Sequence, residues 1–344
     1  MPVPELQKFI VAINDEFPLL EFLYVGTEAK NDMSLVLSTS FRAPRLRHLV
    51  LHHFALPIGS PLLMAPVSLV TLSFLRIHPS TSFRPIDLLR RLSLMPQLET
   101  LGILFHSFVP DSDIVRELLD PSTMVHATLP NLRWFGFGGA SAYLDALLPR
   151  ITTPLLEKLQ LRFADELIFS VSRLLPYMST AKNLKLISAD VYFDASGVDV
   201  KVYPCEGAKI YSFWLDVACE DIDFQVYSIA EVLDDLSPIF SAVEHLTLAS
   251  ANNNLSPDLY DEFDRSQWRK LLRSFSKVKV LLIGDELVGE VSRCLRSKEE
   301  ELPLELLPEL KELSYPAGRE DGDRFTDFIE ARQNAGRPLI VVRR

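Results

Sequence analysis

The residues of this chain that could do chemistry are few and far apart in the sequence. The run Gly136-Phe137-Gly138-Gly139-Ala140-Ser141 follows an expected strand and precedes an expected helix, where a dinucleotide-binding fingerprint would stand. The third glycine of that fingerprint is missing, and Glu157 precedes its strand instead of ending it, so the expected ribose contact fails. We therefore interpret these glycines as a turn that uses their backbone freedom.

Histidines and carboxylates are the other candidates for a reactive or metal-binding site. His48, His52 and His53 form the densest histidine group. On a strand, His48 and His52 would lie about 13 Å apart at ~3.3 Å per residue, too far to share one metal ion. The carboxylates of Glu220, Asp221 and Asp223 have no partner with an evident acid or base role. The pattern predicts a polar surface for the histidines and a solvated loop for the acids.

The remaining sequence also gives no catalytic signature. It contains no G-x-S-x-G elbow, no phosphate-binding loop and no H-E-x-x-H motif. Cys205, Cys219 and Cys294 are too scattered for a disulfide framework or a zinc module. The composition, 48% hydrophobic and 24% charged, is that of a packed globular protein. We expect a protein that is not an enzyme and has no metal and no cofactor.

A repeated phrase runs along the whole chain and supplies the elements that must position any site. The phrase is often a proline, one residue, an apolar residue, two variable residues, and then leucine-x-apolar. It is clearest as MPQLETLGI from Met95 and TPLLEKLQL from Thr153. The first apolar position falls at Leu20, Leu46, Leu69, Leu98, Leu132, Leu156, Leu184, Ile210, Val243, Val278 and Leu310. A mean spacing of about 29 residues over these copies indicates a solenoid of stacked units.

Each copy predicts a short strand, and the segments between copies predict helices. The L-x-L tail alternates apolar and variable residues, as a strand with one buried face does. Helical spacing recurs in segments such as PIDLLRRLSLM from Pro85, SDIVRELL from Ser112, SAYLDALL from Ser141 and WRKLLRSF from Trp268. We expect one parallel sheet built from the tails with helices outside it, in a single domain over 1–344. A capping helix over 1–16 and a terminal helix and strand over 323–344 would close its ends.

This rhythm resembles the leucine-rich-repeat superfamily over essentially the whole chain. The N-x-L and G-x-I-P segments of the extracellular type are absent, as are cysteine caps. The long, irregular copies are more similar to the repeat domains of intracellular F-box proteins, especially a divergent family abundant in mushroom-forming fungi. The resemblance implies an α/β horseshoe with a parallel concave sheet and outer helices. It also implies the substrate-binding role of a ubiquitin-ligase receptor, located in the cytoplasm or the nucleus.

The F-box itself is not seen. Leu302-Pro303-Leu304-Glu305-Leu306-Leu307 reads like its opening phrase, but Pro308 interrupts the helix and no W-R pair follows. We interpret this match as chance. A cullin-ligase adaptor would be a partner only if an F-box lies upstream of Met1.

No membrane or nucleic-acid partner is expected. The 28 uncharged residues between Arg47 and Arg76 could span a bilayer in length, but three prolines interrupt them. The chain begins without the basic and apolar regions of a signal peptide. The net charge of −11 argues against nucleic acid. From Asp190 to Asp264 there are 16 acids against two lysines, whereas 42–91 and 265–298 are basic, so the acidic block could steer a basic protein partner.

The variable positions beside the L-x-L residues are expected to line the concave sheet and to bind a protein partner. By register they include Tyr24, His48, His52, Trp134, Lys158, Arg162, Trp214, Asp216 and His245. Tyr, Trp and Arg are the residue types that most often anchor protein interfaces. We expect a recognition module similar to the substrate-binding half of an F-box receptor. The alternatives are a repeat scaffold or a regulator of small GTPases, with no ligase link, and an unrecognised enzyme.

Overall fold

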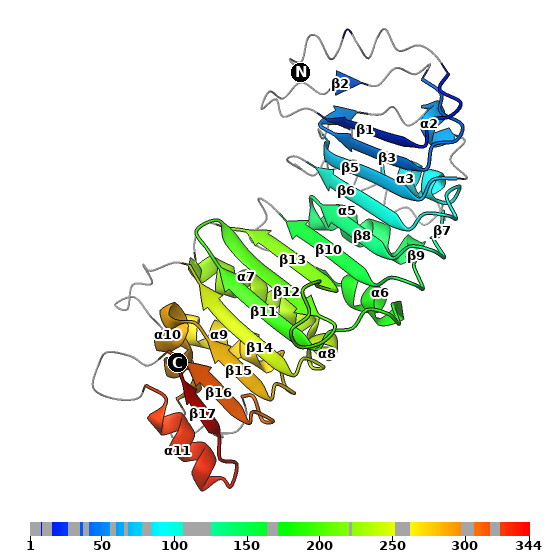
Figure 1. The fold of residues 1–344 in the computed structure, drawn as a ribbon. Coiled ribbons are helices and arrows are strands. Elements are labelled where there is room, and N and C mark those ends of the chain that lie inside the picture. The colour runs from blue at the N-terminus through cyan, green and yellow to red at the C-terminus, as the bar shows by residue number, and fades with distance from the viewer. Residues whose placement is uncertain are drawn as a thin grey trace. The chain divides into compact units, whose positions relative to one another are not determined.

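The fold is mixed α/β, with mostly parallel β-sheet and helices, and it divides into two compact units (Figure 1). The computed structural model describes residues 8, 16–26, 35–36, 41–55, 60–64, 68–77, 84–105, 125–163, 171–219, 222–251, 262–296, 306–316 and 324–344. Unit 1 comprises 1–165 and 176–183, and unit 2 comprises 166–175 and 184–344. In neither unit do the described strands close into a barrel. The single domain expected from the sequence stays a prediction.

Unit 1 is built on parallel strands laid side by side in chain order. They are β1 (Phe22–Gly26), β3 (His48–His52), β5 (Thr71–Ile77), β6 (Thr100–Phe105), β8 (Trp134–Gly138) and β10 (Lys158–Phe163). Two short parallel pairs accompany them: β2 (Leu35–Val36) with β4 (Phe54–Ala55), and β7 (Ala127–Thr128) with β9 (Ile151–Thr152). The helices are α2 (Pro61–Met64), α3 (Pro85–Leu92), α5 (Ser141–Leu147) and the 3-10 helix η2 (Leu148–Arg150), and most of α6 (Leu174–Thr180), whose first two residues belong to unit 2.

The repeat leucines of unit 1 form its core, as the alternation of the L-x-L tails predicts. Leu49, Leu101 and Leu159 are completely buried. Helix α3 begins with a proline and buries Ile86 and Leu89, which follows from the favourable position of proline in a first turn. On α5, Tyr143 packs its ring against Phe105 and Phe137, with centroids 5.2 and 5.9 Å apart. Burial raises the pKa of the Tyr143 hydroxyl, because the low-dielectric core disfavours the phenolate.

Unit 2 alternates strands and helices but does not add all of its strands in chain order. Its sheet has the order β13 (Phe213–Ala218), β12 (Gly197–Tyr203), β11 (Ser188–Phe193), β14 (His245–Ser250), β15 (Val280–Ile283), β16 (Glu312–Tyr315) and β17 (Ile340–Arg343). The helices are α7 (Ile222–Asp235), α8 (Ser237–Phe240), α9 (Glu262–Arg273), the 3-10 helix η3 (Asp285–Leu287), α10 (Val288–Leu295) and α11 (Thr326–Asn334). The rings of Phe213, Phe240 and Phe275 pack in series in this core.

The expectation of an all-parallel sheet in chain order is wrong in unit 2. Strand β12 pairs antiparallel with both β11 and β13, whereas β11 pairs parallel with β14. The chain therefore runs from β11 through β12 to β13 as a three-stranded meander before α7 leads it to β14. Strand β12 lies between two copies of the repeat, and the leucine phrase does not include it.

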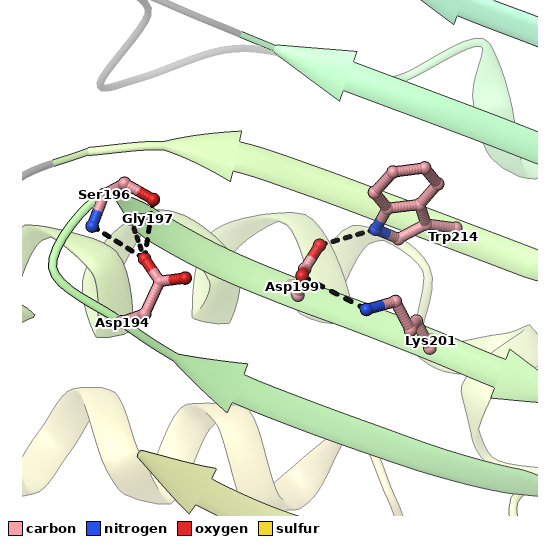
Figure 2. Close-up of polar contacts among 6 residues, drawn as sticks. All are labelled: Asp194, Ser196, Gly197, Asp199, Lys201 and Trp214. Carbon is pink, nitrogen blue, oxygen red and sulfur yellow. Dashed lines mark hydrogen bonds and ion pairs between the residues drawn. The ribbon is translucent and has the colours of Figure 1, made fainter. Parts of the chain in front are cut away.

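A tight turn between β11 and β12 makes the meander possible (Figure 2). The Asp194 carboxylate accepts hydrogen bonds from the Ser196 amide at 2.6 Å, the Ser196 hydroxyl at 2.7 Å and the Gly197 amide at 3.0 Å. This arrangement is an aspartate-stabilised turn. A Cβ atom at Gly197 would lie 2.2 Å from the Val217 carbonyl oxygen on β13. Only glycine lets β12 and β13 approach so closely at that point.

The seventh copy of the repeat is shifted by two residues from the predicted register. Leu184 was expected as its first apolar position, but Leu184 is half-buried and Leu186 is buried. The inward residues of β11 are Ala189, Val191 and Phe193, which follow Leu186 at the spacing of the other copies. Two leucines two residues apart, without the usual proline, make both registers plausible in sequence, and packing selects the second.

Some expectations lie outside the described residues. These are the helix SDIVRELL, nearly all of the capping segment 1–16, and most of the F-box-like phrase. Over 323–344, the described residues form α11 and β17. Arg332 of α11 is buried and donates to the carbonyl oxygens of Leu307 at 3.1 Å and Leu310 at 2.8 Å, which fixes this helix to the loop before β16. Among the helices that are described, none has both the length and the apolar character needed to cross a bilayer.

Candidate functional site

The outward side chains of unit 1 form three rows across its strands, which we call the unit 1 face. Register pairing aligns Phe22, His48, Thr71, Thr100, Trp134 and Lys158 in one row. The second row is Tyr24, Val50, Ser73, Gly102, Gly136 and Gln160. The third row has two parts, because the register shifts between β5 and β6 after Phe74: Gly26, His52 and Leu75 are aligned on the first three strands, and Leu104, Gly138 and Arg162 on the last three. None of these described positions is acidic, so the face combines apolar, small and basic residues.

Trp134 stands at the centre of a site on this face. Its partner in the register is Lys158 on β10, and adjacent strands lie about 4.8 Å apart. A Cβ atom at Gly136 would lie 2.5 Å from the indole of Trp134, and one at Gly102 would lie 3.2 Å from it. The indole therefore rests on a floor of two glycines from neighbouring strands. Burial lowers the pKa of the Lys158 ammonium. Arg162 lies on the same strand, in the third row, and is exposed.

The histidines at the other side of the unit 1 face make polar and ring contacts. His48 Nδ1 lies 3.0 Å from the Thr71 hydroxyl, and its ring lies 5.8 Å from that of Phe22. His52 packs edge-on against His53, with ring centroids 4.5 Å apart. Tyr24 and Phe22 are both more than half exposed. Within the described ranges, no three His, Cys, Asp or Glu side chains come together as a metal site would require.

The outward side chains of the meander form a second surface, which we call the meander surface. Its members are Asp190 and Tyr192 of β11, Asp199, Lys201 and Tyr203 of β12, Trp214 and Asp216 of β13, and Tyr211 just before β13. Trp214 Nε1 donates to Asp199 at 2.5 Å, and Lys201 Nζ lies 3.2 Å from the same carboxylate (Figure 2). The Tyr211 ring meets Trp214 edge-on at 5.6 Å. This surface joins aromatic rings to an excess of acids.

Burial, and then the neighbouring acids, raise the pKa values of two tyrosines on the meander surface. Burial is the largest cause for Tyr203, and the negative charge of Asp190, to which its hydroxyl is hydrogen-bonded, adds to it. Burial and the charge of Asp199 raise the pKa of Tyr211 in the same way. Both hydroxyls therefore stay protonated near neutral pH, so Tyr203 can donate to Asp190.

The structure brings some of the predicted residues together and separates others. Trp134 and Lys158 are neighbours in unit 1, and Trp214 and Asp216 belong to one surface in unit 2. The expectation that strands follow one another in chain order fails in unit 2, so Trp214 does not have the neighbours that this order implied. His245 lies on β14 with Nε2 3.6 Å from the Glu206 carboxylate.

Sequence reasoning missed Asp199, Lys201 and Tyr203, because it assigned no strand to 197–203. The sequence does contain a signal for this strand. Val198, Val200 and Val202 alternate with polar residues, and the Asp194-Ala-Ser-Gly197 phrase before them is a turn signal. Alternating runs joined by such a turn are typical of a hairpin.

Glu220 and Asp221 lie outside the described residues, and the loop predicted for Asp223 is wrong, because this residue belongs to the first turn of α7. The interpretation of the Gly136–Gly139 run as a turn is right only for Gly139, which follows β8 at a φ of 154°, because Gly136 and Gly138 lie within the strand. No model of a known protein family matches the chain, and no curated protein matches it.

Proposed function

We propose that this chain is a non-enzymatic protein-recognition module that binds its partner through the unit 1 face around Trp134, Lys158 and Arg162. The observation that carries the proposal is the position of Trp134. Its indole covers Gly102 and Gly136 and lies beside Lys158, on a face whose described positions include no acid. A rigid aromatic side chain next to an Arg or Lys is a common anchor of protein interfaces. The remaining predicted members of this face are Tyr24, His48 and His52.

The chemistry of the unit 1 face suits an extended acidic and apolar segment. Lys158 and Arg162 supply positive charge on β10, and Val50, Leu75 and Leu104 supply apolar surface on three other strands. Partial burial of Lys158 strengthens its attraction for a carboxylate, because screening by water is reduced. An approaching carboxylate would also restore the pKa of Lys158 toward its usual value.

We further propose that the architecture is a leucine-rich-repeat solenoid and that the role is similar to that of the substrate-binding part of an F-box ubiquitin-ligase receptor. The support is the repeat itself, whose leucine-x-apolar tails coincide with inward-facing strand residues in both units, although Ile210, the first apolar position of the eighth copy, is exposed. If an F-box lies upstream of Met1, the native protein should copurify with the adaptor subunit of a cullin ligase. The absence of copurification would favour the alternative, a repeat scaffold or regulator of small GTPases without a ligase link.

The test of recognition compares two double variants in affinity capture from the native source, followed by binding measurements with the purified partners. Trp134→Ala/Arg162→Glu changes the unit 1 face. Leu155→Ala/Lys182→Glu makes equivalent changes at exposed positions of turns in the same unit. We expect the first variant to lose a partner that the second retains, with both folded by circular dichroism. An identical set of partners and affinities for both variants and the wild type would refute the proposal.

A further inference from the structure

The ammonium group of Lys201 is a cation on the meander surface. Its Nζ lies 5.6 Å from the centre of the Trp214 ring and 3.2 Å from the Asp199 carboxylate (Figure 2). Lys201 and Trp214 are partners in the register of β12 and β13, so the ammonium reaches the ring from the adjacent strand. Trp214 Nε1 donates to the same carboxylate. The three side chains together form a site in which a positive charge lies between an aromatic face and an anion.

The meander surface retains an acid excess with Lys201 in place. Among the members of this surface, three are aspartates (Asp190, Asp199 and Asp216) and one is a lysine, and Asp199 and Asp216 are register partners on adjacent strands. Like charges at opposed positions of a sheet repel each other, and an added cation relieves that repulsion. Tyr192 adds a ring that is 39% exposed. The charge of this sheet face therefore complements a basic ligand.

Displacing Lys201 requires little free energy. Its side chain is 36% exposed, and its ion pair with Asp199 is only partly buried. Exposed ion pairs contribute little to stability, and a lysine side chain is flexible and well solvated by water when released. A guanidinium is a better occupant, because it is planar, stacks on an indole and can form two hydrogen bonds to one carboxylate.

We propose that the meander surface binds a basic segment of a protein partner and that an arginine of that segment takes the place of the Lys201 ammonium over Trp214 and beside Asp199. Lys201 is then an internal competitor, which occupies the site in the free protein. It favours arginine over lysine in the partner, because a lysine would only exchange one ammonium for another. The inference rests on the proposed function, since it assigns the partner chemistry of a recognition module.

The experiment titrates the full chain with labelled peptides and measures affinity by fluorescence anisotropy. The probes are glycine-serine peptides that carry three arginines, three lysines or three glutamates. Lys201→Gln removes the competitor. Lys209→Gln is the matched control, because it makes the same charge change at an exposed position in the same unit. Asp199→Asn removes the anion but keeps an oxygen that can accept from Trp214 Nε1.

At the meander surface, we expect the arginine peptide to bind more tightly than the lysine peptide and the glutamate peptide not to bind. Lys201→Gln should tighten binding of the arginine peptide by about three- to tenfold, and Asp199→Asn should weaken it by a similar factor, as expected for one cation–π contact and one ion pair. Lys209→Gln should change it by less than about twofold, since an exposed charge outside the site formed by Lys201, Trp214 and Asp199 is screened by salt. Equal tightening by Lys201→Gln and Lys209→Gln would show a general charge effect and overturn the proposal.

The indole N–H resonance of Trp214 locates the binding site independently of affinity. The resonance is assigned by its loss in Trp214→Phe, and it should shift when the arginine peptide is added, while those of Trp134 and Trp268 stay in place. Binding without a shift of Trp214, or no binding to the Lys201→Gln variant, would overturn the inference. Neither result bears on the unit 1 face, whose role depends on the Trp134 and Arg162 variants.

Discussion

At the scale of single residues, Trp134 depends on the glycines beneath it. Gly102 and Gly136 are paired in the register of β6 and β8, and both face outward. Glycine in a strand interior weakens the strand but lets another group approach the backbone closely. Here that group is the indole, which covers the backbone that the two glycines leave bare. The two glycines weaken their strands, and the same two glycines make room for the indole of Trp134.

Gly136→Ala should displace the indole of Trp134. The added Cβ would lie 2.5 Å from the ring, a distance that forces the side chain to move, whereas in Gly102→Ala the nearest ring atom is 3.2 Å away. We expect a red shift of tryptophan emission and weaker capture of the partner for Gly136→Ala, and smaller changes for Gly102→Ala. Emission spectra and binding measured on both variants test this. Unchanged emission in Gly136→Ala would show that the indole of Trp134 does not pack against Gly136.

The buried leucines of unit 1 should each contribute strongly to stability. Leu101→Ala and Leu159→Ala should each cost ~2–5 kcal/mol in free energy of unfolding, because both side chains are completely buried and leave cavities. Leu155→Ala, at a 38% exposed position, should cost less than about 0.5 kcal/mol. Urea unfolding measures all three. A cost below ~1 kcal/mol for both core variants would contradict the packing described here.

At the scale of elements, the repeat phrase predicted strands wherever leucine spacing and strand spacing coincide. Strands β6 and β10 follow directly from Leu98 and Leu156, since a period of two with one apolar face has few other solutions. The predicted helices at Pro85 and Ser141 are confirmed as α3 and α5. Helical spacing with a buried face and a proline at the start explains the first of these.

The meander could not be read from the same phrase. Strand β12 carries valines in place of leucines, and Asp199 and Lys201 alternate with them, so its charges suggested a loop in an acidic region. The order β13-β12-β11-β14 depends on pairing between segments distant in sequence, which local patterns do not encode. The candidate site was predicted in part for the same reason. Trp214 and Asp216 belong to a recognised copy, whereas Asp199 and Lys201 do not.

The turn before β12 should make the stability of unit 2 sensitive to pH. Hydrogen bonds from Ser196 are the main cause that lowers the pKa of Asp194 in the folded protein, with the Gly197 amide adding to it. A carboxyl group whose pKa is lower when folded stabilises the fold above its unfolded pKa of about 3.9, and this stabilisation is lost as the pH falls through the folded pKa.

Asp194→Asn should therefore lower the free energy of unfolding by roughly 0.5–1 kcal/mol near neutral pH, about the value of one hydrogen bond. The difference from the wild type should shrink as the pH is lowered below about 4. Urea titrations over a pH series give this difference directly. Asp258→Asn carries the same substitution elsewhere in the chain and serves as the control. A difference from the wild type that does not vary with pH would mean that the carboxylate is not what holds the turn.

At the scale of the whole molecule, the charge distribution distinguishes the two proposed surfaces. The net charge is −11, yet the described positions of the unit 1 face include no acid, while the meander surface carries three aspartates and one lysine. The two surfaces therefore suit segments of opposite charge. A single basic or acidic segment would be accepted by one surface and repelled by the other, which is a source of specificity.

The overall negative charge should mainly affect the association rate constant of a basic ligand. Between about 20 mM and about 200 mM NaCl, the association rate constant of the arginine peptide should fall by about tenfold, because long-range attraction is screened. The dissociation rate constant should change less, since the contacts at Trp214 and Asp199 are short-range. Stopped-flow mixing measures both constants. A salt effect confined to dissociation would contradict electrostatic steering.

The meander also restricts how many strands can be inserted into this sheet. One reversal leads from β11 to β12 and a second leads from β12 to β13, so β13 again runs in the direction of β11 and β14. With a single reversal, the chain would leave the sheet at the opposite end, and α7 would have to cross the sheet to reach β14. Insertions that preserve the polarity of the later repeats must therefore bring strands in pairs, and a longer relative of this chain should gain two strands here rather than one.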